Sequence, residues 1–172
     1  METAPAQRQA AILFADIAGS TRLYETLGDA EALATITRAL DLIRQVCEEH
    51  GGRIVKTIGD EAMAIFPNAA NAAYASITMQ TQVSGMKTRF HYGPVIEERK
   101  DVFGDSVTLA ARLTSLAKAS QTLLSEDTLA ILSPSLRSRT RPQDTHTVRG
   151  KQNDIAVFEL IWQESREELT AM

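Results

Sequence analysis

Two aspartates, each next to an apolar run, are the residues whose placement points to chemistry. Asp16 directly follows the run AAILFA at residues 10–15, and Asp60 lies in a Gly-Asp turn between the segments RIVKTI and EAMAIF. Two carboxylates brought together repel each other unless a cation neutralises them, and oxygen ligands favour Mg²⁺ or Mn²⁺. The pair therefore indicates a two-metal site. Each aspartate also has an ordinary explanation, since Asp16 suits a helix cap and Asp60 suits a hairpin turn.

The segment IAGSTR after Asp16 is a second feature with chemical consequences. It contains a glycine turn followed by two hydroxyl residues, Ser20 and Thr21, which are candidate N-caps of a helix. The backbone N–H groups from Ile17 through Gly19 to Thr21 would open that helix, and such groups bind phosphates well. A metal site beside a phosphate cradle indicates a nucleoside triphosphate as the ligand.

Hydrophobic patterning predicts the elements that hold these residues. A strand over 10–15 leads into a helical region that is long enough for two helices. The buried stripe of this region is expected to comprise Leu33, Ile36, Leu40, Ile43 and Cys47. Gly51 and Gly52 end the region as C-terminal capping glycines. Residues 53–66 then form a hairpin around the Gly-Asp turn.

The second half of the chain is expected to hold helices over 69–83 and 105–119, an extended segment over 87–98 and strands at 121–125 and 154–160. The helix over 105–119 is expected to bury Val107, Ala110, Ala111 and Leu113. The order β-α-β-β-α-β is the split βαβ or ferredoxin-like arrangement of an α+β fold, in which the third strand lies antiparallel between the first two. This topology places Asp16 and Asp60 side by side at one edge of a sheet covered by helices.

Composition limits the class of protein. With 172 residues, of which 44% are hydrophobic, the chain is long enough for one well-packed domain. The net charge of −4 gives no basic surface for nucleic acid or for an anionic membrane. The lone cysteine, Cys47, excludes an intrachain disulfide, and no apolar run approaches the roughly 20 residues that cross a bilayer. Because METAPAQRQAA lacks a secretory signal, we expect a cytoplasmic protein without a nucleic-acid or membrane partner.

Four segments in this order resemble the class III nucleotidyl cyclase catalytic domain: FADIAGSTRL (14–23), KTIGDEAMAIF (56–66), KDVFGDSVTLAARL (100–113) and VRGKQNDIAVFEL (148–160). The resemblance implies a catalytic domain over 8–162, with 163–172 as a polar tail or the start of a linker to a regulatory domain. It implies adenylate cyclase activity, in which ATP becomes 3′,5′-cyclic AMP and pyrophosphate. It also implies a homodimer, in which each site draws metal ligands from one subunit and base-reading residues from the other.

Positions that match the family's motifs receive roles from the resemblance. Asp16, Asp60 and the Ile17 carbonyl match the ligands of two Mg²⁺ or Mn²⁺ ions per site. Lys56 and Asp101 match the pair that recognises adenine. Their chemistry agrees with this role, because adenine offers an acceptor at N1 and a donor at N6, whereas guanine presents the reverse order. The pair therefore favours ATP.

Three further residues stand at the family's phosphate and ribose positions, and a fourth lies close to one of them in sequence. Arg112 matches an arginine that stabilises charge on the transferred phosphoryl group, a role that suits its permanent charge. Arg149 matches a basic residue that holds the terminal phosphates, and Lys151 lies close enough in sequence to assist. Thr108 stands where many active members carry an asparagine that orients the ribose. A shorter donor there predicts an enzyme slower by on the order of 10²-fold.

Two other functions remain open from the sequence. A catalytically silent cyclase homology domain, acting as a nucleotide-binding regulatory or dimerisation module, has Thr108 in its favour, whereas a guanylate cyclase is disfavoured by Lys56 and Asp101. Each matched charge also fits an ordinary exposed position on a strand, loop or helix. The three histidines lack ligand spacing, Cys47 fits the core, and Glu61 is expected to be a solvated or lightly paired charge.

Overall fold

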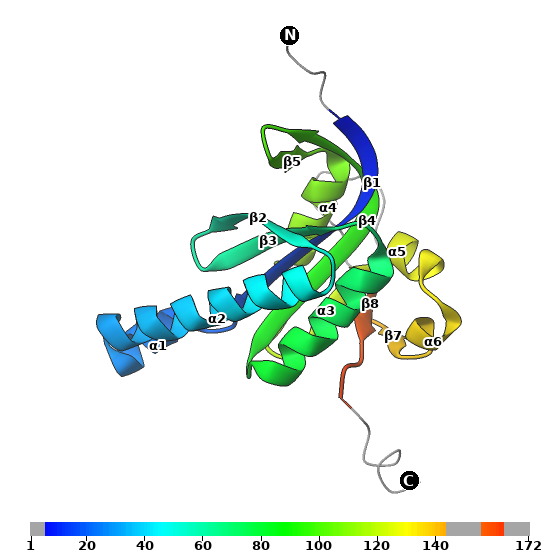
Figure 1. Cartoon of the computed structure of the whole chain (residues 1–172). Helices are drawn as coiled ribbons and strands as arrows, with labels where there is room; N and C mark the ends of the chain where they lie inside the picture. The colour runs from blue at the N-terminus through cyan, green and yellow to red at the C-terminus, as the bar shows by residue number, and fades with distance from the viewer. Residues whose placement is uncertain (1–5, 144–155, 164–172) are drawn as a thin grey trace, which may run out of the picture.

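The computed structural model describes residues 6–143 and 156–163, which form one sheet with helices on both faces (Figure 1). The strands are β1 (Ala6–Ile17), β2 (Arg53–Ile58), β3 (Glu61–Phe66), β4 (Met86–Glu98), β5 (Asp101–Phe103), β6 (Thr122–Ser125), β7 (Thr140–Pro142) and β8 (Val157–Leu160). The helices are α1 (Ser20–Leu27), α2 (Asp29–Glu49), α3 (Ala69–Gln82), α4 (Asp105–Leu113), α5 (Glu126–Ile131) and α6 (Pro134–Arg137). No helix in these two ranges is long and apolar enough to cross a membrane.

The strand order is β2-β3-β1-β4-β6-β8-β7, with β5 paired to β4. β3 lies between β1 and β2 and runs antiparallel to both, and β4 pairs antiparallel with the other side of β1. These four strands, with α2 and α3 as their connections, confirm the predicted ferredoxin-like core of an α+β fold. β4 and β6 pair in parallel. The short elements β5, β7, α5 and α6 were not predicted, because three to six residues show too little periodicity.

β1 is buried on both faces, which explains its uninterrupted apolar run. Leu13 belongs to the core cluster that includes residues of α2 and α3, whereas Ile12 and Phe14 belong to the cluster that includes Ala110 of α4. Successive side chains of a strand point to opposite faces, so one run serves both layers. The end of this central strand carries Asp16 out of the core to the sheet edge.

Four predicted helix features are wrong. The helix expected over 105–119 ends at Leu113. Gly19, with a φ of 75°, is the N-cap of α1 and no side chain caps that helix, so Ser20 and Thr21 are not N-caps. Leu33 is 57% exposed, because the buried stripe of α2 passes through Ala32 and Ile36 and leaves Leu33 to one side. On α4, Ala111 is exposed and Leu109 is buried instead, since the inward stripe there comprises Ser106, Leu109, Ala110 and Leu113.

The end of α2 agrees with the prediction. Gly51 has a φ of 80°, a left-handed conformation that glycine adopts without strain. The Gly52 N–H donates to the Cys47 carbonyl at 2.8 Å, a contact typical of a helix ended by glycine. Ile36, Ile43 and Cys47 of the predicted stripe are buried.

Candidate active site

Three carboxylates lie at one edge of the sheet. In the pairing of β1 with β3, Ala15 is opposite Ala62, so the next residues, Asp16 and Glu61, follow on across the two strands. Asp60 directly precedes Glu61 in the turn, where Gly59 has a φ of 60°. The topology therefore carries Asp16 and Asp60 to the same edge, as the order of elements predicted.

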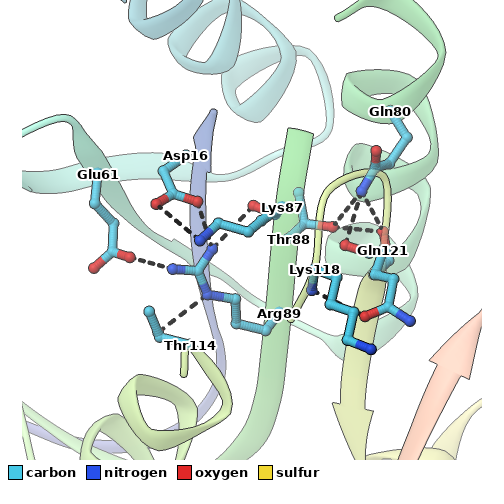
Figure 2. A network of polar contacts seen from close by, with 10 residues as sticks. Asp16, Glu61, Gln80, Lys87, Thr88, Arg89, Thr114, Lys118 and Gln121 are labelled. Carbon is cyan, nitrogen blue, oxygen red and sulfur yellow. Dashed lines mark hydrogen bonds and ion pairs between the residues drawn. The ribbon is translucent and has the colours of Figure 1, made fainter. Parts of the chain in front are cut away.

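A buried arginine of β4 binds two of these carboxylates (Figure 2). Nη1 of Arg89 donates to Oδ1 of Asp16 at 3.0 Å, and Nη2 forms an ion pair with Glu61. Nε donates to Oγ1 of Thr114 at 3.0 Å, and the side chain of Arg89 is fully buried. The guanidinium is thus held from three sides, by β1, by β3 and by the residue that follows α4.

Lys87 brings a second cation to Asp16. Its Nζ lies 3.8 Å from Oδ2, the carboxylate oxygen that Arg89 does not bind. Sequence reasoning missed both cations. The available signal is their spacing, because residues 87 and 89 of one strand share a face.

Glu61 departs from its prediction. It was expected to be a solvated or lightly paired charge, but its side chain is only 19% exposed and pairs with the buried Arg89. Burial raises the pKa of the Glu61 carboxyl, the Arg89 guanidinium lowers it, and the neighbouring Asp16 raises it again; the net shift is upward. The reason lies in the β1–β3 register, which turns Glu61 toward the arginine.

The oxygen donors at this edge fit the chemistry of Mg²⁺ or Mn²⁺. Asp60 forms no side-chain hydrogen bond or ion pair with any residue in the described ranges, so its carboxylate is available. Within those ranges no group of three acidic, histidine or cysteine side chains is arranged to hold a metal ion. The groups that could hold an ion here are Asp16, Asp60 and the Ile17 carbonyl, with water or ligand oxygens to complete its shell.

The candidate phosphate cradle is narrower than predicted. The Ala18 N–H already donates to the Gly85 carbonyl at 2.9 Å. The first N–H groups of α1 have no acceptor within the helix, which leaves those of Ser20 and Thr21, with Gly19 before them, as candidate donors. No acidic residue lies in the first turn of α1 to oppose an anion.

Lys56 and Asp101 come together although 45 residues separate them in the chain. Nζ of Lys56 lies 3.1 Å from Oδ2 of Asp101, and the two side chains are 43% and 33% exposed. The Val102 N–H donates to Oδ1 at 2.8 Å. This backbone hydrogen bond and then Lys56 lower the pKa of the Asp101 carboxyl. The predicted base-reading pair therefore exists as an exposed, charged ion pair.

A tight turn positions Asp101. In the pairing of β4 with β5, Glu98 is opposite Asp101, so Arg99 and Lys100 form the loop. Both have positive φ, 52° and 66°, as the central residues of a type I′ turn do. Neither residue is a glycine, and this local conformation was not predicted.

Arg112 and Thr108 lie one turn apart on α4 and so share a face. Nη1 of Arg112 is buried and has no hydrogen-bond partner among the described residues. An unpaired buried donor is costly, which marks it as a group that a ligand can satisfy. Oγ1 of Thr108 is exposed and donates to the Gly104 carbonyl at 3.4 Å.

Other predicted residues divide into two sets. Arg149, Lys151 and His146 lie outside the described residues. Cys47 is fully buried, as predicted, and burial raises the pKa of its thiol to about 12. His50 binds the Val46 carbonyl at 2.9 Å, and buried His91 binds Ser125 at 2.6 Å, so both have structural contacts.

The sequence of this chain matches a known protein family. The model of the adenylate and guanylate cyclase catalytic domain matches residues 2–91 and 90–161. An adenylate cyclase of Streptomyces coelicolor is 32% identical over 142 residues, which are 78% of this chain and 36% of that protein. The chain thus spans little more than a third of this relative's length.

Solved structures agree with the sequence match. An adenylate/guanylate cyclase/hydrolase from Silicibacter pomeroyi has a TM-score of 0.78 and 25% identity, over 92% of this chain and 99% of that one. A guanylyl cyclase domain from Blastocladiella emersonii, described as a non-canonical dimer, has the same fold at a TM-score of 0.75 and 19% identity, over 90% of this chain and 97% of that one. With a family model that covers nearly the whole chain and this fold, the protein belongs to the family of adenylate and guanylate cyclase catalytic domains.

Proposed function

We propose that this chain is the catalytic domain of an adenylate cyclase, which converts ATP to 3′,5′-cyclic AMP and pyrophosphate at sites shared by two subunits of a homodimer. The observation that carries the proposal is the contact between Lys56 and Asp101 at 3.1 Å. A cation and an anion held side by side match the acceptor and donor of adenine.

In the proposed complex, Lys56 and Asp101 release each other and bind the adenine base instead. The Lys56 ammonium donates to adenine N1, and the Asp101 carboxylate accepts from the N6 amino group. In the free chain the two side chains bind each other, but exposed ion pairs of this kind contribute only about 0–1 kcal/mol. A purine edge therefore displaces the contact at little cost. Guanine would face both charges with the wrong polarity.

The carboxylates at the ends of β1 and β3 are the proposed metal ligands. Asp16, Asp60 and the Ile17 carbonyl would hold Mg²⁺ or Mn²⁺. When bound, such ions lower the pKa of the ribose 3′-OH and neutralise the triphosphate. Asp60 suits this role because its carboxylate has no other partner in the described ranges.

The remaining proposed contacts act on the ribose and the phosphates. The ribose 3′ oxygen bonds to the α-phosphorus, its proton leaves, and the bond to pyrophosphate breaks. Arg112 donates to the charge that develops on the α-phosphoryl oxygens, since its buried Nη1 has no hydrogen-bond partner among the described residues. Thr108 contacts the ribose, and the N–H groups at Gly19, Ser20 and Thr21 contact the phosphates. Arg149 and Lys151 are proposed for the terminal phosphates.

Two exposed apolar residues support a partner subunit near the base-reading pair. Ile58 is 52% exposed and Phe103 is 48% exposed. Each follows one member of the pair by two positions on its strand, so it shares that residue's face. Large apolar side chains grouped beside a site often mark an interface. We propose that a second copy of the chain covers them.

The experiment that tests the proposal measures cyclic nucleotide formation by purified protein from ATP and, separately, from GTP. Each nucleotide is supplied with Mg²⁺ or Mn²⁺ over a range of protein concentrations. We expect cyclic AMP, with a specific rate that rises with protein concentration as dimers form. Preferred use of GTP would contradict the base assignment. Binding of metal-ATP by the purified dimer without turnover would favour a silent regulatory domain, for which Thr108 is the supporting residue.

A further inference from the structure

Arg89 is the most completely bonded charged side chain at this edge of the sheet. It is fully buried, and every nitrogen of its guanidinium has a partner. Nη1 donates to Asp16 and also to the Lys87 carbonyl, each at 3.0 Å, while Nη2 pairs with Glu61 and Nε donates to Thr114. These four contacts fix the guanidinium in place (Figure 2).

This arrangement occupies a carboxylate that the proposed function gives to a metal. Oδ1 of Asp16 accepts from Arg89, and Oδ2 lies 3.8 Å from Nζ of Lys87. A divalent cation can bind Asp16 only by sharing these oxygens with the two side chains or by displacing them. Hydrogen bonds between charged groups are stronger than those between neutral groups, so displacing Arg89 from Asp16 opposes metal binding.

We propose that Arg89 is a resident counter-ion of the active site, which competes with divalent cations for Asp16 and keeps metal affinity low until a nucleotide arrives. The inference rests on the proposed function, because it takes Asp16 as a metal ligand. It adds the order of binding. Two side-chain cations, Arg89 and Lys87, balance the charge of the two carboxylates that they contact, Asp16 and Glu61. The triphosphate supplies the missing negative charge, so metal enters with it.

The test measures Mn²⁺ binding to nucleotide-free protein, using the electron paramagnetic resonance signal of unbound Mn²⁺. Three proteins are compared: wild type, Arg89→Gln and Arg8→Gln. Arg8 is a matched control because it loses the same charge from a more exposed ion pair with Glu97, at the opposite end of β1. We expect Arg89→Gln to bind Mn²⁺ about tenfold more tightly than wild type, and Arg8→Gln to match wild type. A merely structural defect would weaken binding.

Equal or weaker Mn²⁺ binding by folded Arg89→Gln overturns the proposal. A second measurement uses wild type alone, in case this variant does not fold. Nuclear magnetic resonance follows the Asp16 carboxyl carbon and the Arg89 Nε–H during titration with Mg²⁺. Both signals should shift together. If only the Asp16 signal shifts, or if neither signal shifts, the proposal that Arg89 competes with the metal is overturned.

The cyclase assay separates this inference from the proposed function. If cyclic AMP forms but Arg89→Gln gains no Mn²⁺ affinity, only the role of Arg89 is wrong. If no cyclic AMP forms and no protein binds Mn²⁺, both proposals are wrong.

Discussion

Arg89 and Lys56 each form ion pairs with residues far away in sequence, yet the two sets of ion pairs differ in burial. Arg89 is fully buried and holds Asp16 and Glu61, whose side chains are 20% and 19% exposed. Lys56 and Asp101 are 43% and 33% exposed. Removing one partner of a buried pair leaves an uncompensated charge, at a cost of about 3–5 kcal/mol, whereas an exposed pair contributes about 0–1 kcal/mol. The buried network therefore fixes geometry, and the exposed pair is free to exchange partners with a ligand.

The largest expected effect is a loss of activity with little loss of stability, at one of the three carboxylates. Asp60→Asn should lower cyclase activity by roughly 10³-fold, because a neutral amide is a poor ligand for a divalent cation. Its free energy of unfolding should change by less than about 0.5 kcal/mol, since Asp60 has no ion pair in the described ranges. Initial rates with Mn²⁺-ATP and urea unfolding measure the two quantities. A loss of stability as large as that expected for Arg89→Met would contradict the difference between Asp60 and the two carboxylates that bind Arg89.

The second effect tests the buried network directly. Arg89→Met should lower the free energy of unfolding by about 3 kcal/mol, because it strands the Asp16 and Glu61 carboxylates without their cation. Urea unfolding followed by circular dichroism measures the change. Arg8→Met serves as the control, since its ion pair with Glu97 is more exposed and should contribute less than about 1 kcal/mol. Equal changes in the two variants would contradict the contrast.

The smallest effect concerns the exposed pair. Asp101→Asn should change the free energy of unfolding by less than about 1 kcal/mol, yet lower the preference for ATP over GTP roughly tenfold. Because the folded protein lowers the pKa of Asp101 below 3.8, the carboxylate's contribution to stability is fully present above that pH and is lost as the pH falls through the lowered pKa. The difference in stability between variant and wild type should therefore stay constant from about pH 7 to about pH 5.

Urea unfolding at several pH values and competition between ATP and GTP check these expectations. Lys56→Met is the matched variant from the other side of the pair. If either variant lost as much stability as Arg89→Met, the exposed pair would contribute as much to stability as the buried Arg89 network. That result would contradict the contrast between the two regions.

Much of the fold follows from local patterns that can be recognised in the sequence. The apolar run before Asp16, the Gly-Asp turn and the glycines after α2 each predict a local structure, and the order of elements then permits a ferredoxin-like sheet. The errors lie where tertiary packing decides. Leu33 fits a helical stripe of large apolar residues, but the packed structure buries the small Ala32 at that turn and leaves Leu33 exposed.

The sequence by itself determined the residue types of the candidate site and the topology that brings Asp16 and Asp60 to one edge. Only the tertiary structure decided which charges meet. Nothing in local spacing shows that Arg89 reaches both Asp16 and Glu61, because those contacts depend on how β1, β3 and β4 align. Burial also depends on every layer that covers a side chain. The same kind of ion pair is therefore fixed at Arg89 and exchangeable at Lys56.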